Sequence, residues 1–235
     1  QRYLRKNGPE RERFSDPDAS WGHRSATSTR KHGGFYGYKN NMVVCIRTDL
    51  PIACHVTTAR TNESSQVERL LSAVQARNFT PVTVTFDKGY DFEAVYDACH
   101  QAGVLPVIPL RKTTAVKQGK HLPPTCEHGT WTFAGTDFKN KRTKWRCPTG
   151  DCQPKSLWRK ASRLHPLIPR ETQRWGDLYR GRSSVEREFG RLKHDYGLTP
   201  LRVRGLDRVQ LHTDLTMLAA LSAALARARA LPLAA

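Results

Sequence analysis

The sequence predicts an α/β fold, because its first half alternates strand-like and helix-like segments in the order β-β-α-β-α-β. The strand-like segments are rich in β-branched residues, several of them alternating with polar ones. The helix-like segments place apolar residues at i, i+3, i+4 and i+7. Hydrophobic residues make up 38% of the 235 residues, which is enough to bury a core.

The first elements are a pair of strands and a helix. Residues 36–47 and 52–58 are β-type runs joined by a short polar connection that contains Pro51, which predicts an antiparallel hairpin. Residues 63–77 have a helical apolar stripe, and Asn62 is the candidate N-cap.

The next elements alternate again. Residues 81–86 (PVTVTF) predict a strand that ends at Asp87, and a helix follows until Gly103. Residues 104–110 predict a further strand. Near the carboxyl end we expect one helix from Tyr179 to Tyr196 and a long core helix over 206–230, with these apolar positions: Val209, Leu211, Leu215, Leu218 and Leu225.

These elements define three regions. Residues 1–34 contain no convincing strand and predict a basic arm. Residues 35–110 together with 178–230 form the main α/β domain. Residues 111–177 break the periodic pattern, contain three of the six cysteines and four of the five tryptophans, and predict an irregular insertion before the last two helices.

The chain is strongly basic, with 39 Lys and Arg against 21 Asp and Glu, a formal charge of +18 and a pI near 10.1. This excludes an acidic or neutral housekeeping enzyme and favours a polyanionic partner, nucleic acid first. The alternative is a solvated basic surface without a partner. No run approaches the ~18 consecutive apolar residues of a membrane span, and no secretory signal is evident, so we expect a soluble, cytoplasmic protein without membrane contact.

One segment combines charges at helical spacing. On a helical wheel Tyr179, Arg182, Glu186 and Lys193 share an arc of about 60° beside the apolar face. Glu186 is therefore expected at the edge of the core, and Glu188 as an ordinary solvent carboxylate. The stripe suits an anionic ligand that carries a metal; the alternative is a weak surface ion pair between Arg182 and Glu186.

Asp87 is the second candidate, because it ends a predicted strand and Gly89, close behind it, permits close approach of another chain. The alternative is an ordinary Asp in a turn. Two carboxylates, one from a strand end and one from a helix, suit Mg²⁺, which prefers hard oxygen ligands and assists phosphodiester chemistry.

These residues carry a resemblance to a known family. The segment FDKGYD (86–91) and the spacing Tyr179-x2-Arg182-x3-Glu186-x6-Lys193 resemble the second acidic motif and the Y-R-E-K signature of insertion-sequence DDE transposases. Three other segments are similar to the same family, namely FYGYK (35–39), PIACHVTTARTNESS (51–65) and LRVRGLDRVQLH (201–212).

The resemblance covers most of residues 15–225 and carries several implications. It implies a ribonuclease H-like mixed sheet flanked by helices, and metal-dependent DNA cleavage and strand transfer at the ends of a bacterial mobile element. It assigns Asp87 and Glu186 as Mg (or Mn) ligands and Tyr179, Arg182 and Lys193 as DNA contacts. The partners are double-stranded DNA, at transposon ends and target, and a second copy of the chain in the DNA complex.

The chain departs from this family at one point. The family needs a first catalytic Asp on a strand before the hairpin, and the early candidates, Asp16 and Asp18, lie in a loop-like SDPDASWG segment. We therefore expect that an amino-terminal portion with this Asp is missing. The alternatives are completion of the site by Asp16 or Asp18, a catalytically silent DNA-binding remnant, and an unrelated Mg-dependent nuclease of the same fold.

The insertion holds a second set of candidate ligands. Cys126-x-His128 and Cys147-x4-Cys152 supply three thiols and an imidazole, a possible structural Zn²⁺ set, the alternative being free buried cysteines. Lysines and arginines surround Trp131, Trp145 and Trp158, which suits contacts to phosphate and unpaired bases. The alternative is that these tryptophans pack the insertion against the sheet.

Overall fold

The computed structural model describes residues 16–24 and 31–230, which divide into two compact units with boundaries after residue 78 and after residue 182. The first unit joins the amino-terminal strands to the last two helices. The second unit holds everything between them. Most of the predicted arm over 1–34 lies outside the described residues.

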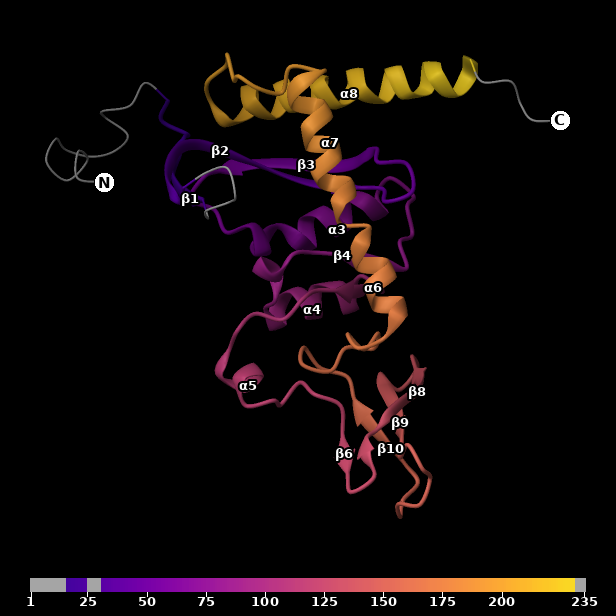
Figure 1. The fold of residues 1–235 in the computed structure, drawn as a ribbon. Coiled ribbons are helices and arrows are strands. Elements are labelled where there is room, and N and C mark those ends of the chain that lie inside the picture. The colour runs from indigo at the N-terminus through magenta and orange to yellow at the C-terminus, as the bar shows by residue number, and fades with distance from the viewer. Residues whose placement is uncertain (1–15, 25–30, 231–235) are drawn as a thin grey trace, which may run out of the picture. The chain divides into compact units, whose positions relative to one another are not determined.

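The first unit is built on an antiparallel sheet in the order β1-β2-β3 (Figure 1). Its strands are β1 (Ser20–Arg24), β2 (Gly33–Val44) and β3 (Pro51–Thr58). The predicted hairpin is confirmed as β2 and β3, and Asn41 pairs with His55 at its middle.

Strand β1 corrects the expectation that no strand precedes the hairpin. Residues of low β-propensity, such as Ser20 and Gly22, form it because they pair with β2, Ser20 opposite Gly37 and Gly22 opposite Phe35. Gly22 is needed for close packing, since a Cβ there would lie 2.5 Å from the Ala59 carbonyl oxygen. Pairing partners elsewhere in the chain, not local pattern, make this strand.

Helices cover the sheet of the first unit, with α3 on one face and α8 on the other (Figure 1). The helical elements are η1 (Glu63–Gln66), α3 (Val67–Gln75), α7 (Ser183–His194) and α8 (Leu206–Ala230). The predicted cap is confirmed, because the Asn62 side chain accepts a hydrogen bond from the Ser64 amide at 3.2 Å. The predicted apolar stripe of α3 is buried, namely Val67, Leu70, Leu71 and Val74.

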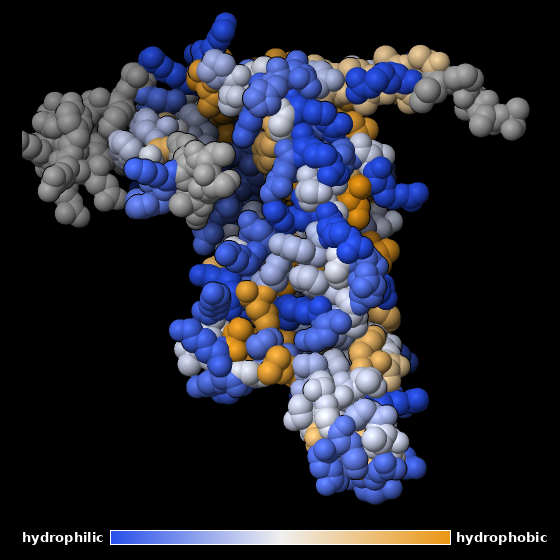
Figure 2. Space-filling view, in the orientation of Figure 1, coloured by the Kyte–Doolittle hydropathy of each residue, from blue (hydrophilic) through white to orange (hydrophobic). Residues whose placement is uncertain are grey.

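The bounds of α8 agree with the prediction, but its buried face does not. Val209 is buried, whereas Leu211, Leu215 and Leu218 are 56–60% exposed. The buried face instead carries Thr213 and Thr216, whose hydroxyls donate to carbonyls one turn earlier and so cost little to bury. Among the described helices, α8 has the length and composition of a membrane span; its exposed side contributes apolar colours in Figure 2.

The turn between β2 and β3 is held by α7. Arg187 donates from Nε and Nη2 to the two carboxylate oxygens of Asp49, at 2.6 and 2.8 Å. Arg191 also reaches the Asp49 carbonyl oxygen. The hydrogen bond from Arg187 lowers the pKa of Asp49 to about 2, assisted by Ser184 and opposed by burial.

This contact predicts a small, pH-dependent loss of stability in Asp49→Asn. The pKa of Asp49 is lower in the folded than in the unfolded chain, so its contribution is complete above about pH 4 and disappears as the pH falls toward 2. The variant should melt about 2 °C lower at pH 7, because a solvent-exposed pair is screened, and the difference should vanish near pH 2. Thermal melts across this range test it, with Asp97→Asn, an exposed helix carboxylate, as control.

The second unit begins with a parallel strand pair, β4 (Thr83–Thr85) and β5 (Leu105–Val107), connected through η2 (Lys88–Tyr90) and α4 (Glu93–Gln101). This confirms the predicted strand–helix–strand order. The short helix α5 (Thr114–Lys117) follows, and α6 (Gln173–Arg180) ends the unit.

A buried polar network joins this strand pair to the segment before α6. Asp91 is 3% exposed and accepts from Arg163 at 2.6 Å and from the Arg111 amide at 2.8 Å. Arg170 donates to the Tyr96 hydroxyl at 2.7 Å and to the Ile108 carbonyl at 3.0 Å. These bonds satisfy polar groups that would otherwise be costly to bury.

The predicted insertion is not irregular throughout. It contains a hairpin of β6 (Thr125–Cys126) and β7 (Gly129–Thr130), and an antiparallel sheet in the order β10-β9-β8. Its strands are β8 (Thr132–Asp137), β9 (Arg142–Arg146) and β10 (Ser156–Lys160). We call residues 125–160 the β-module.

The mixed α/β class is confirmed. The described strands form two three-stranded and two two-stranded sheets.

Candidate functional sites

The first unit has a groove of about 640 Å³ between its sheet and α7. Strand β2 contributes Tyr38, Lys39 and Asn40, and α7 contributes Glu186 and Lys193. Glu186 and Lys193 are both exposed. They lie seven residues, or two turns, apart on α7, about 10.5 Å along its axis, so the structure brings these two predicted site residues to one groove.

The charges of the groove are partly paired. The Lys39 ammonium lies 3.3 Å from a Glu63 carboxylate oxygen and donates to the Thr61 carbonyl at 3.1 Å. The Lys193 ammonium lies 5.6 Å from the centre of the Phe189 ring, within range of a cation–π contact. The groove thus offers two carboxylates, Glu63 and Glu186, and two lysines, which suits a phosphate-containing ligand that carries a cation.

The predicted single helix over 179–196 is wrong, because α6 ends at Arg180 and α7 begins at Ser183. Gly181 is a poor helix former. The amides of Gly181 and Arg182 donate hydrogen bonds to carbonyl oxygens three residues earlier, which forms a tight turn. Tyr179 therefore lies on α6 in the second unit, stacked on Trp175 with ring centres 4.9 Å apart. Arg182 lies in the turn, at the end of that unit.

The expectation that Glu188 is a solvent carboxylate is also wrong. Glu188 is 1% exposed, and its Oε2 accepts from Arg191 Nε at 2.8 Å, while its Oε1 has no hydrogen-bond partner among the described residues. The buried residues of α7 are Ser184, Glu188 and Leu192, one turn apart on one face, so tertiary packing selects a face that the apolar pattern did not indicate. Glu186, expected at the edge of the core, is exposed at the groove.

Asp87 follows β4 in the second unit and is exposed. Its Oδ1 accepts a 2.6 Å hydrogen bond from the Gly89 amide, which caps η2. A Cβ on residue 89 would lie 2.8 Å from that oxygen, so Gly89 makes room for the carboxylate of Asp87; the expected approach of another chain stays a prediction. Oδ2 carries no such bond among the described contacts and remains open to a ligand.

The carboxylates of Asp16 and Asp18 accept hydrogen bonds from backbone amides at the beginning of α8. Asp18 accepts from the Leu206 amide at 2.9 Å, and Asp16 accepts from the Gly205 amide and, at 2.7 Å, from the Tyr38 hydroxyl. Burial and this bond to Asp16 raise the pKa of Tyr38. Both carboxylates stabilise the positive end of a helix.

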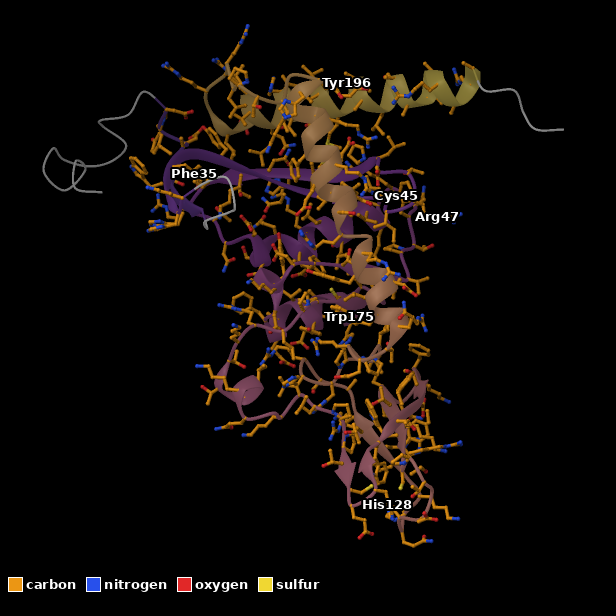
Figure 3. The ribbon with its side chains drawn as sticks, in the orientation of Figure 1. Phe35, Cys45, Arg47, His128, Trp175 and Tyr196 are labelled. Atoms are coloured by element: carbon orange, nitrogen blue, oxygen red, sulfur yellow. The ribbon has the colours of Figure 1, made fainter. Side chains whose placement is uncertain are left out.

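The four candidate zinc ligands converge at one end of the β-module. Cys126 and His128 belong to the hairpin of β6 and β7, Cys147 follows β9, and Cys152 lies in the loop before β10. Their ligand atoms all lie within 4.8 Å of one another. In Figure 3, sulfur atoms lie beside the labelled His128.

The separations within this Cys/His cluster fit a tetrahedral ion. Cys126 Sγ and Cys147 Sγ are 3.8 Å apart, and His128 Nδ1 is 3.8 Å from Cys147 Sγ and 3.5 Å from Cys152 Sγ. With Zn–S near 2.3 Å and Zn–N near 2.1 Å, a tetrahedral site requires about 3.8 Å between sulfurs and about 3.6 Å between sulfur and nitrogen.

The surroundings favour a thiolate at Cys147. Burial raises the pKa of this thiol, but hydrogen bonds from Thr149 and from the backbone amides of Cys152, Thr149 and Gly150 outweigh it and leave the pKa at about 5. Trp131 and Trp145 pack in one core with Cys147 of the Cys/His cluster, and the two tryptophans are 7% and 4% exposed. These two tryptophans are thus buried in a core inside the β-module, and not against the main sheet as the packing alternative expected, whereas Trp158 is 43% exposed.

A comparison with known protein families matches residues 6–222 to the transposase DDE domain. The chain belongs to this family. It is a DDE transposase domain of the insertion-sequence kind, and DNA is the partner that this family implies. No curated protein and no solved structure matches the chain significantly.

Sequence reasoning missed part of the transposase groove, namely Lys39, Asn40 and Glu63. A signal for them existed, because Lys39 lies in FYGYK and Glu63 in the TNESS segment, both of which resemble the family. Asn40 is notable because neither of its two buried amide atoms, Oδ1 and Nδ2, has a hydrogen-bond partner in the described structure.

Proposed function

We propose that this transposase domain performs metal-dependent phosphodiester cleavage and strand transfer at transposon ends. The observation that carries the proposal is the exposure of Glu186 and Lys193 to one groove of a DDE transposase domain. A carboxylate with an adjacent cation suits a scissile phosphate and its counter-ion. The strand–helix order also supports a ribonuclease H-like fold, and we propose a homodimer in the DNA complex on the resemblance to the family alone.

Asp87 and Glu186 are the proposed ligands of Mg²⁺ or Mn²⁺. Both are exposed carboxylates, which are the donors that these hard cations prefer. Such an ion, when bound, activates the attacking oxygen and stabilises the leaving one. Lys193, Tyr179 and Arg182 are proposed to contact DNA phosphate near the cleaved end.

A second candidate function is DNA binding without cleavage. It is favoured by Asp16 and Asp18, whose carboxylates bind the first amides of α8 and are thereby occupied in a structural role. Under this alternative the chain keeps the basic surface but assembles no complete metal site. The third candidate function is that of a Mg-dependent nuclease of the same fold.

DNA binding and DNA cleavage measured side by side separate these functions. We expect the chain to bind a duplex carrying its own element's ends and to cleave it with Mg²⁺ or Mn²⁺ but not with EDTA. Binding without cleavage in any of these ions would contradict the first function and support the second. Cleavage of unrelated duplexes at the same rate would support the nuclease.

The β-module carries a proposed site for a second metal. We propose that Cys126, His128, Cys147 and Cys152 bind one structural Zn²⁺. The support is the fit of their separations to a tetrahedral site and the soft donor set, three thiols and one imidazole. All four coordination positions are filled by protein, which is typical of structural and not catalytic zinc.

A further inference from the structure

The outer face of the β-module carries a row of cations. In β9 the side chains alternate, so that Thr143 and Trp145 are buried while Arg142, Lys144 and Arg146 point to the opposite face. Residues two apart in a strand are about 6.8 Å apart, so the row spans about 14 Å.

Strand β10 extends this face. Cross-strand partners share a face of a sheet, and Trp158 pairs with Lys144 while Lys160 pairs with Arg142. The Trp158 ring supports both neighbouring cations, with its centre 4.4 Å from the Arg142 guanidinium carbon and 5.5 Å from the Lys144 ammonium. We name this surface, made of Arg142, Lys144, Arg146, Trp158 and Lys160, the basic sheet face.

Little on the β8 side neutralises or covers this face. Asp137 pairs with Arg142, its Oδ2 lying 3.0 Å from Nε, so one of the four cations is compensated. Opposite Lys144 stands Gly135, where a Cβ would meet no atom within 4 Å. The β-module as a whole carries eight Lys or Arg against three Asp or Glu, and its surface in Figure 2 is mostly hydrophilic.

We propose that the basic sheet face binds the phosphate backbone of duplex DNA. Its row of cations has the length of about four nucleotide steps of one strand, at 3.4 Å per step. The charge complements a polyanion, and Arg142 and Lys144 lie over the Trp158 ring. The contact is to phosphate, so it adds affinity without reading base sequence. This inference rests on the proposed DNA partner and assigns it a second surface, distinct from the groove of the first unit.

The test is the double variant Lys144→Ala with Lys160→Ala, compared with Lys112→Ala with Lys117→Ala. The control removes the same charge from exposed positions of the second unit outside the β-module. Affinity for a 30-base-pair duplex is measured by fluorescence anisotropy at several salt concentrations, with the full chain. We expect the first variant to bind at least about tenfold more weakly at 0.1 M salt, and the slope of log affinity against log salt to fall by about 2.

The outcomes are separable. The loss should be the same for a duplex of scrambled sequence, and zinc content should stay at the wild-type value, which shows that the β-module is folded. If the wild type binds and the first variant keeps the same affinity and salt slope, the proposed role of the basic sheet face is overturned, but the proposed DNA partner is not. Equal losses of DNA affinity in both variants would also overturn it, because the net positive charge of the whole chain would then explain the binding. Failure of the wild type to bind any duplex would contradict the proposed DNA partner itself.

Discussion

Glu186→Gln is expected to abolish metal-dependent cleavage while leaving the fold and DNA binding in place. The glutamine keeps the size of the side chain but lacks the negative charge that holds a divalent cation. Metal stabilisation of the transition state is worth several kcal/mol, so the rate should fall about a thousandfold or more. Because Glu186 is exposed, its substitution should not alter the melting temperature.

Two other glutamates make this experiment specific. Glu68→Gln changes an exposed carboxylate in the first turn of α3 and should cleave as the wild type does. Glu188→Gln lies two residues from Glu186 but is buried against Arg191, so it should lower the melting temperature instead. Rates are measured under single-turnover conditions with Mg²⁺ and Mn²⁺. Wild-type cleavage by Glu186→Gln would overturn the role of this residue.

The second large effect is expected at the Cys/His cluster. Protein purified without chelator should contain about one Zn²⁺ per chain, and Cys147→Ser should contain almost none. Structural zinc contributes about 10–16 kcal/mol of apparent binding energy in small domains, so its loss should unfold the β-module. Elemental analysis and limited proteolysis within residues 125–160 report the two effects.

Cys45→Ser is the matched control for this experiment, because Cys45 is a free cysteine of the first unit that lies outside the Cys/His cluster. It should keep the zinc and the protease resistance of the wild type. Chelation of the wild-type protein should reproduce the behaviour of Cys147→Ser. A zinc content near zero in the wild type would end the zinc assignment, since the cysteines would then be free thiols in a packed core.

Local pattern was sufficient for the elements whose burial follows a simple period. The hairpin of β2 and β3 and the stripe of α3 agree with the prediction because each repeats apolar residues at the spacing of its own backbone. The spacing of the four zinc candidates likewise indicated a cluster before any fold was known. These features depend on residues close together in the chain.

Other features depend on residues far apart, and the sequence misled at each of them. Strand β1 exists because β2 pairs with it, although Ser20 and Gly22 carry little β-propensity. The helix breaks at Gly181, and the packing of α7 buries Glu188 and leaves Glu186 exposed. On α8, neighbours in the sheet select a threonine-lined face and leave the leucine face in solvent.

The family, the basic character and the four residues of the Cys/His cluster could thus be predicted from the amino-acid sequence. That sequence specifies motif spacing and charge, which do not require a folded chain. Which carboxylate faces the groove, how closely the thiols and the imidazole approach, and which cations share the basic sheet face were decided by tertiary structure. Those properties depend on helix phase, strand register and long-range pairing, which are set by packing of the whole unit and not by any local segment.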